Sequence, residues 1–396
     1  MQQIATRAGL STPSLAGKRI GIVAGEASGD LLGSHLIRAL KAAGADIQFI
    51  GVAGPRMIAA GAVSLFPMEK LAVRGYVEVL RHYREIARIR RKLVDYFLAN
   101  PPDVFIGIDA PDFNLKLEQR LKAKGITTLH YVGPSIWAWR GERIRKIAQA
   151  VSRILVLFPF ESPIYERAGI PVSYVGHPLA DMLPWEPDRG AARAQLKLPR
   201  NGTVIAMLPG SRQSELHYLA ELFVQTAREI IRQRPDTRFL VPLVSRETRA
   251  YFEQAIYRLG ARDLPLAILF GHAHDAMMAA DVVLVASGTA TLEAALLKRP
   301  MVITYKVSQL TWKLAKRKSY LPYVGLPNIL AGRFVVPELL QQDATPENLS
   351  QALLNLLDDE QVRNGLAVEF SRLHSALRQG TGDRLVAAVL PYLAKR

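Results

Sequence analysis

The chain contains no cysteine. That absence excludes disulfide bridges, thiolate metal sites and a cysteine nucleophile. Long apolar runs are also missing, whereas a membrane-spanning helix needs roughly 20 consecutive apolar residues. The first 17 residues lack the apolar core of a signal peptide. We therefore expect a cytoplasmic protein in which residues 1–17 form a flexible tail.

Several motifs of nucleotide and metal chemistry are absent as well. The chain has neither a Walker A sequence nor a G-x-G-x-x-G pattern, so an ATPase or a dehydrogenase is not indicated. It has no Asp-x-Asp pair, and no histidine cluster has metal-ligand spacing. We therefore expect no bound metal ion and no cofactor.

Acidic residues are outnumbered by basic ones. The 51 Lys and Arg residues against 35 Asp and Glu residues give a formal net charge of +16. A basic surface attracts nucleic acid, anionic lipid or a phosphorylated substrate, or is simply solvated. Composition alone leaves these alternatives open.

Apolar runs of strand length alternate with helical patterns along most of the chain. Predicted strands such as Arg19–Ala24 and Val104–Ile108 precede a proline-containing stretch at 182–200, after which the pattern restarts with Val204–Leu208. Alternation at this spacing is typical of βαβ units around a parallel sheet.

The pattern predicts an α/β protein with two Rossmann-like, doubly wound domains that face a cleft. The first domain is expected at residues 18–183 and the second at 184–375, with a C-terminal helix at 376–396 that packs back on the first. Because ligands of such sheets bind outside the carboxyl ends of the strands, we expect the site there.

Three glycine-marked junctions stand where a predicted strand meets a predicted helix. They read GEASGD, LPGSRQSE and ASGTATLEAAL. Free backbone N–H groups at a helix start suit phosphate, although ordinary helix caps give the same pattern. Arg212 could reach a diphosphate, and Glu293 could accept ribose hydroxyls. The candidate substrate-binding residues of these junctions are Gly25, Glu26, Ser28, Gly29, Gly210, Ser211, Arg212, Ser287, Gly288, Thr289, Thr291 and Glu293.

The string GIDAPDFN places Asp109 at the end of an apolar predicted strand. A carboxylate at such a strand end is well placed to act as a general base. An Asx-type turn, in which Asp109 only bonds backbone N–H groups, explains the same pattern. The residues alone leave both interpretations open.

Three stretches mix aromatic and basic side chains, at residues 78–91, 131–145 and 311–323. Such a surface can lie on an anionic bilayer or bind nucleic acid by stacking. Core aromatics with solvated basic faces give the same pattern. The strongest candidate for a membrane contact is 78–91, with possible insertion residues Val79, Tyr83, Ile86 and Ile89.

Seven strings occur together in one order and jointly resemble one family. They are GEASGD, GVAGPRM, GIDAPDFN, YVGPSIWAWR, LPGSR, ASGTATLE and LPNILAGR, and they lie within about residues 19–391. The combination resembles the lipid-A-disaccharide synthase family, which are GT-B-fold glycosyltransferases of lipopolysaccharide assembly. The sequence departs from the family at Gly133, where serine is common.

The resemblance implies an inverting transfer. UDP-2,3-diacylglucosamine would be the donor and 2,3-diacylglucosamine 1-phosphate the acceptor, and the products would be the β-1,6-linked lipid A disaccharide 1-phosphate and UDP. The resemblance implies a peripheral enzyme on the anionic inner face of the inner membrane, with no nucleic-acid partner and no cofactor.

Residue roles follow from the matched strings. Asp109 matches the family's proposed base. Arg212, with the loop Ser287–Thr291, would hold the diphosphate, and Glu293 the ribose. The first domain would face the membrane and bind the acceptor, and the second would bind the UDP-sugar. The donor site would also include two residues of LPNILAGR, Asn328 and Arg333.

Two rival functions are compatible with the sequence. A UDP-N-acetylglucosamine 2-epimerase of the same fold would turn over free UDP-N-acetylglucosamine and need no apolar surface for acyl chains. A non-catalytic membrane- or nucleic-acid-binding protein would show no affinity for UDP.

Overall fold

The computed structural model describes residues 17–44, 46–71, 76–139, 141–318 and 320–394. The chain forms two compact units, which are called unit 1 and unit 2. Unit 1 comprises Met1–Pro178 and Gln379–Arg396, and unit 2 comprises Leu179–Arg378. Apart from Gly17, the predicted tail lies outside the described residues.

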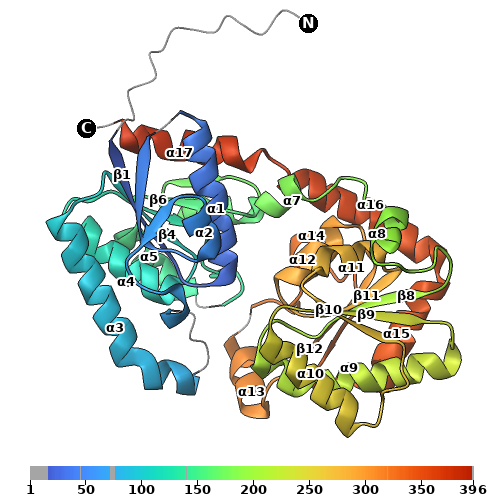
Figure 1. The fold of residues 1–396 in the computed structure, drawn as a ribbon. Coiled ribbons are helices and arrows are strands. Elements are labelled where there is room, and N and C mark those ends of the chain that lie inside the picture. The colour runs from blue at the N-terminus through green and yellow to red at the C-terminus, as the bar shows by residue number, and fades with distance from the viewer. Residues whose placement is uncertain (1–16, 45, 72–75, 140, 319, 395–396) are drawn as a thin grey trace, which may run out of the picture. The chain divides into compact units, whose positions relative to one another are not determined.

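Unit 1 is built on a seven-stranded parallel sheet with the strand order β3-β2-β1-β4-β5-β6-β7 (Figure 1). Central strands such as β4 are buried along their whole length, as expected for a sheet covered on both faces. The strands are β1 Lys18–Ala24, β2 Ile47–Val52, β3 Ala62–Ser64, β4 Val104–Ile108, β5 Thr128–Tyr131, β6 Arg153–Val156 and β7 Val172–Tyr174.

Helices cover both faces of this sheet, with α1, α2 and α17 on one side and α3 and α4 on the other (Figure 1). The helices are α1 Ala27–Ala42, α2 Pro55–Ala59, α3 Tyr76–Ala99, α4 Pro111–Lys122, α5 Ile144–Ala150, α6 Ser162–Arg167 and α17 Thr381–Leu393. Short 3₁₀ turns are η1 Met68–Lys70, η2 Gly141–Arg143 and η3 Pro159–Glu161.

Unit 2 repeats the architecture with six parallel strands in the order β10-β9-β8-β11-β12-β13. Its strands are β8 Val204–Leu208, β9 Arg238–Leu243, β10 Leu266–Phe270, β11 Val282–Ala286, β12 Met301–Tyr305 and β13 Glu338–Leu340. Its helices, α7 starting at the boundary, are α7 Pro178–Met182, α8 Arg189–Gln195, α9 Gln213–Gln233, α10 Arg246–Arg258, α11 Ala273–Ala279, α12 Thr289–Leu296, α13 Gln309–Lys318, α14 Leu326–Ala331, α15 Pro346–Asp358 and α16 Glu360–Leu377, with a 3₁₀ turn η4 Gln341–Asp343. The predicted fold class, two doubly wound α/β domains, is confirmed.

The last helix, α17, belongs to unit 1 and packs on α1. The Arg153 guanidinium donates to the Tyr392 hydroxyl at 3.0 Å, and Arg384 donates to the Tyr174 carbonyl at 3.2 Å. The chain enters unit 2 after Pro178 and leaves it after Arg378. The C-terminal segment therefore completes the unit that the N-terminal residues begin.

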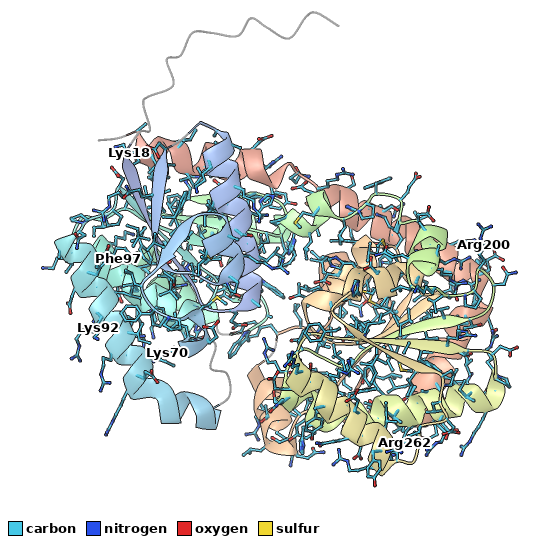
Figure 2. The ribbon with its side chains drawn as sticks, in the orientation of Figure 1. Lys18, Lys70, Lys92, Phe97, Arg200 and Arg262 are labelled. Atoms are coloured by element: carbon cyan, nitrogen blue, oxygen red, sulfur yellow. The ribbon has the colours of Figure 1, made fainter. Side chains whose placement is uncertain are left out.

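Helix α3 packs on the sheet through its C-terminal half. The Phe97 ring, labelled in Figure 2, meets Phe105 of β4 edge-on at 5.4 Å between ring centroids. Ile89 is only 5% exposed. Its proposed role in membrane insertion is therefore wrong, because this side chain is core. Ile86 is half-buried, and the side chains of Val79 and Tyr83 lie outside the described part of the structure.

Candidate active site

The strand order of unit 1 reverses direction between β1 and β4, which makes their carboxyl ends the expected ligand position. Ala24 pairs with Ile108, so Gly25 and Asp109 follow neighbouring strand ends. A Cβ built on Gly25 would lie 2.7 Å from the Ala110 Cβ. Glycine at position 25 therefore allows the loops after β1 and β4 to touch.

Asp109 sits in an unusual backbone turn. Asp109 and Ala110 have φ values of 51° and 45°, the left-handed region that non-glycine residues rarely adopt. The Asp109 N–H donates to the Tyr131 carbonyl at 2.9 Å. The Asn114 amide donates to the Asp109 carbonyl at 2.8 Å. The turn is thus held from β5 on one side and from α4 on the other.

The Asn114 side chain is fully buried and organises this strand edge. Besides Asp109, its Nδ2 lies 3.3 Å from the carbonyl oxygens of Val23 and Ile108. The half-buried Asp109 carboxylate makes no hydrogen bond within the described residues, so the Asx-turn interpretation has no support there. A carboxylate that bonds no backbone N–H keeps its oxygens available to a substrate hydroxyl.

The rest of GEASGD begins helix α1. Glu26 is its N-cap residue, in extended conformation, and Ser28 is half-buried in the first turn. A Cβ on Gly29 would lie 3.4 Å from the Ala24 Cβ, so the helix start packs on the end of β1. These candidates therefore border the same edge as Asp109.

Asp30 has a structural role that the sequence patterns do not indicate. Its two carboxylate oxygens accept the N–H groups of Arg56 and Met57, each at 2.9 Å, in the first turn of α2. A Cβ on Gly54 would lie 2.5 Å from the Asp30 Cγ. The strings GEASGD and GVAGPRM are therefore two halves of one local structure.

A buried pair lies in the same scaffold. Glu118 of α4 and His130 of β5 are both fully buried, with 2.7 Å between Glu118 Oε1 and His130 Nδ1. Burial raises the pKa of the Glu118 carboxyl, and the nearby His130 partly opposes this rise. His130 precedes Tyr131, whose carbonyl holds Asp109. The pair therefore joins the two elements that shape the Asp109 turn.

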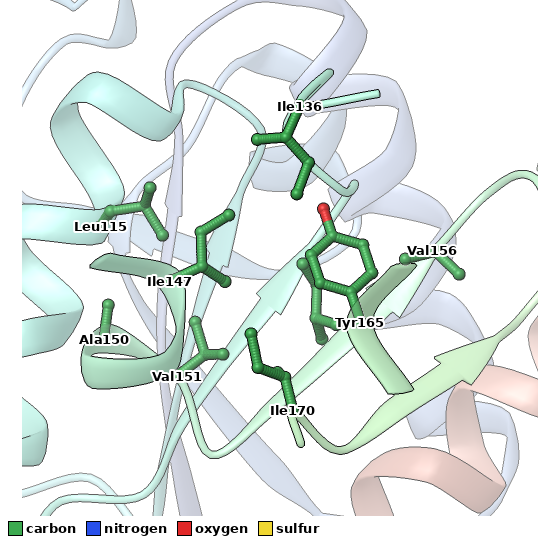
Figure 3. Packing of buried hydrophobic residues seen from close by; sticks show 9 residues of the cluster. Leu115, Ile136, Ile147, Ala150, Val151, Val156, Tyr165 and Ile170 are labelled. Atoms are coloured by element: carbon green, nitrogen blue, oxygen red, sulfur yellow. The ribbon is translucent and has the colours of Figure 1, made fainter. Parts of the chain in front are cut away.

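Gly133 lies close to a buried carboxylate. A Cβ at this position would lie 2.4 Å from Oε1 of the buried Glu161, whose other oxygen accepts the Phe158 N–H at 3.0 Å. Burial raises the pKa of the Glu161 carboxyl to about 8. The next helix places Tyr165 in a core with Ile147, Ile170 and their neighbours, shown in Figure 3.

In unit 2 the corresponding reversal lies between β8 and β11, and two candidate loops follow these strands. After β8, Gly210 has a φ of 121°. Glu215 accepts the N–H groups of Ser211 and Arg212 at 2.8 and 3.2 Å, and it pairs with the Arg212 guanidinium at 3.1 Å. The helix start thus binds an anion, but that anion is its own carboxylate.

After β11, the second loop is tied to a neighbouring segment. The Ser287 hydroxyl donates to the Val324 carbonyl at 3.0 Å. The buried Thr291 hydroxyl donates to the Gly288 carbonyl at 2.8 Å and accepts the Leu326 N–H at 3.3 Å. Gly288 and the adjoining residue Thr289 are exposed.

Asn328 serves the protein itself. Its amide nitrogen donates to the Val336 carbonyl at 3.0 Å and to Glu338 at 2.7 Å. Its amide oxygen accepts the N–H groups of Val335 and Val336 at 2.7 and 3.0 Å. All four hydrogen-bonding positions of this side chain are filled, so it shapes the loop rather than offering a bond to a ligand.

Glu338 is the acceptor on which this loop converges. Besides Asn328, it accepts the N–H groups of Val324 and Gly325, each at 2.9 Å. Arg333 lies further along, largely exposed, and pairs with Glu369 at 2.9 Å. The sequence patterns identify the LPNILAGR string. They do not identify Glu338, which lies ten residues beyond Asn328 and holds this loop through its hydrogen bonds.

Glu293 lies in the second turn of α12 and is half-buried. His274 of α11 bonds its carboxylate, with 3.0 Å between His274 Nε2 and Glu293 Oε2. The sequence patterns assign no role to this histidine. Among the described residues, no group of three or more acidic or histidine side chains has the geometry of a metal site.

The family model for lipid-A-disaccharide synthetase matches residues 20–384. A lipid-A-disaccharide synthase of Methylobacillus flagellatus is 63% identical over 374 residues, which cover 94% of this chain and 99% of that protein. The enzyme of the same name from Pseudomonas aeruginosa strain UCBPP-PA14 is 50% identical over 381 residues, covering 96% and 99% of the two chains.

Solved structures share the fold at low identity. A UDP-GlcNAc 2-epimerase from Neisseria meningitidis has a TM-score of 0.64 at 12% identity and covers 94% of this chain and all of its own. MurG from Acinetobacter baumannii has a TM-score of 0.55 at 16% identity, covering 94% and 99%. Such likenesses extend to the fold alone, so they do not favour the epimerase interpretation.

The matched relatives cover nearly the whole chain at 50% identity or more. All seven strings, from GEASGD to LPNILAGR, lie within the residues that the family model matches. The chain therefore belongs to the lipid-A-disaccharide synthase family of glycosyltransferases.

Proposed function

We propose that this enzyme joins UDP-2,3-diacylglucosamine to 2,3-diacylglucosamine 1-phosphate. The acceptor's 6-hydroxyl oxygen bonds to C1 of the donor sugar while the bond from C1 to the diphosphate oxygen breaks. The hydroxyl proton passes to a base, and UDP leaves. One displacement converts the α-linked donor into the β-1,6-linked disaccharide 1-phosphate. Family membership over residues 20–384 carries this proposal.

Asp109 is the proposed base, in the acceptor-binding unit 1. Its half-buried carboxylate follows β4 in a turn that Tyr131 and Asn114 hold through the backbone. A general base must lie within hydrogen-bond distance of the hydroxyl group that it deprotonates. A turn held on both sides restricts the positions that the Asp109 carboxylate can adopt.

Unit 2 is the proposed donor-binding unit. Glu215 accepts the single N–H of the Ser211 and Arg212 amides and also bonds Nη1 of the Arg212 guanidinium. We assign the diphosphate to the guanidinium, because its five N–H donors can meet a phosphate as well as one carboxylate. The Arg212 side chain is 43% exposed, and its guanidinium suits spread phosphate charge. The exposed start of α12, at Gly288 and Thr289, supplies further N–H donors.

The direct test is incubation with the two diacylated substrates, followed by mass detection of disaccharide 1-phosphate and UDP. A parallel incubation with UDP-N-acetylglucosamine alone tests epimerase chemistry. Formation of disaccharide only in the first reaction supports the proposal. Turnover in the second reaction alone would contradict it.

Arg212→Ala is expected to weaken UDP binding while leaving uridine binding nearly unchanged, because only UDP carries the charge that the guanidinium meets. A hydrogen bond to a charged group contributes about 1.5–3 kcal/mol. Titration calorimetry with both ligands measures the difference.

Arg232→Ala is the matched control. Arg232 forms the same kind of i,i+3 pair, with Glu229 at 2.6 Å, at the other end of α9. It should bind both ligands like the wild type. Equal weakening of UDP and uridine by Arg212→Ala would remove Arg212 from the phosphate site.

We also propose a peripheral attachment to the anionic inner face of the inner membrane. Within the described ranges, every helix is too short or too polar to cross a bilayer. Acylated substrates require contact with a lipid surface, and a net charge of +16 favours an anionic one. On α3, the side chains of Arg88, Arg91 and Lys92 are exposed at helical spacing, and Figure 2 labels Lys92.

Replacing Arg88, Arg91 and Lys92 together by glutamine is expected to reduce binding to anionic vesicles at low salt by about 100-fold, since each basic residue near such a surface contributes about 1 kcal/mol. Vesicle sedimentation measures the loss, which should shrink as salt rises. The control carries the same three-charge change at exposed positions of unit 2, Lys197, Arg200 and Arg246. Equal losses in both variants would exclude α3, and no preference for anionic vesicles would exclude the attachment.

A further inference from the structure

His274 and Glu293 come from consecutive helices of unit 2. His274 lies in the first turn of α11, after a left-handed residue, His272, with a φ of 57°. Glu293 lies on α12, which follows the next strand, β11. The fold thus brings together two side chains that stand 19 positions apart in the sequence.

The bond between them uses only one carboxylate oxygen. His274 Nε2 lies 3.0 Å from Glu293 Oε2, and because a carboxylate only accepts, the ring nitrogen is the donor. Within the described residues, Glu293 Oε1 meets no hydrogen-bond donor. The Glu293 side chain is 20% exposed and that of His274 is 41% exposed, so solvent and ligands can reach the pair.

We propose that His274 is a positioning residue for nucleotide recognition. Its imidazole fixes the rotation of the Glu293 carboxylate and leaves Oε1 to accept hydrogen bonds from the ribose hydroxyl groups. Without this bond, the flexible glutamate side chain must be ordered when the ligand arrives, which weakens binding. The proposal deepens the proposed function, because it rests on UDP occupying unit 2.

A neighbouring pair provides a matched control. His272 bonds Asp275 on the same helix, with 2.8 Å between His272 Nδ1 and Asp275 Oδ2, and its side chain is 55% exposed. His272→Ala and His274→Ala each remove one histidine–carboxylate bond from α11. Only the second removes a bond to the proposed ribose ligand. Since both histidines are partly exposed, neither change should unfold the protein.

The test is titration calorimetry with UDP and with 2′,3′-dideoxyuridine diphosphate, which lacks both ribose hydroxyls. His274→Ala should weaken UDP binding by up to about tenfold, which corresponds to ordering one flexible side chain when the ligand binds. It should leave the affinity for the dideoxy ligand unchanged, because that ligand has no ribose hydroxyl group that could donate to Glu293. His274→Gln, whose amide can donate in place of the ring, should recover part of the UDP affinity. His272→Ala should match the wild type with both ligands.

A double variant separates positioning from general structure. If His274 acts through Glu293, adding His274→Ala to Glu293→Gln should cost little further UDP affinity. If His274→Ala weakens the affinity for both ligands equally, or leaves the UDP affinity unchanged, the positioning role of His274 is wrong. Neither result would contradict the proposed donor site in unit 2. Wild-type protein that does not bind UDP would overturn the proposed function as well.

Discussion

Asp109→Asn is expected to lower turnover by about 10²–10⁴-fold, the usual effect of losing a general base. The substitution keeps the size of the side chain but removes its basicity. Asparagine also tolerates the left-handed backbone at this position, so the turn itself should persist. UDP affinity should not change, because Asp109 belongs to unit 1 and the proposed nucleotide ligands belong to unit 2.

Asp112→Asn is the matched control for this experiment. Asp112 stands three residues later in the same string, is 79% exposed and pairs with Arg143 at 2.5 Å. The same chemical change at this position should leave turnover near the wild-type rate. Initial rates with both acylated substrates measure the two variants. Near wild-type turnover for Asp109→Asn would refute the assignment of Asp109 as the base.

Glu118→Leu is expected to lower the free energy of unfolding of unit 1 by about 3–5 kcal/mol. The substitution removes one partner of a fully buried pair and leaves His130 buried without the hydrogen bond to Glu118. Both side chains have zero exposure, so water cannot replace the lost bond. Urea unfolding followed by tryptophan fluorescence measures the change, with Trp137 and Trp139 reporting from this unit.

The double variant Glu118→Leu with His130→Phe tests whether the loss comes from the stranded histidine. Replacing both partners by apolar side chains of similar size removes the unpaired polar group, so most of the stability should return. A double variant no more stable than Glu118→Leu would show that packing, rather than pairing, sets the cost.

The sequence predicts strand ends well, because parallel strands buried on both faces are continuous apolar runs that small residues terminate. This signal predicts the positions of Asp109 and the glycine-marked loops, and in the structure they lie at the two sheet reversals. Local signals of this kind depend only on residues close together in the chain. The structure adds Glu215, which bonds the start of its own helix three residues after the N-cap Arg212, an N-cap residue that sequence patterns do not mark.

Contacts between distant residues explain what sequence patterns did not reveal. Asp30 reaches the start of α2 only because β1 and β2 are neighbours, and Glu118 meets His130 only because α4 packs beside β5. Asn328 lies in a string that resembles the family, but only the structure shows that its side chain makes all four of its hydrogen bonds to protein groups. Each of these outcomes depends on tertiary packing, which periodicity does not encode.

The return of α17 to unit 1 has a consequence for how the protein is made. Leu385, Val389 and Leu393 of this helix are completely buried, and the Cβ of Ala39 on α1 lies 3.5 Å from a Cβ built on Gly382. About 200 residues of unit 2 are translated before this helix, which at roughly 5–20 residues per second takes about 10–40 seconds. Synthesis of unit 1 begins first, but this unit lacks α17 until residues 381–393 are translated. Unit 2 is therefore the first of the two units to have its complete set of residues.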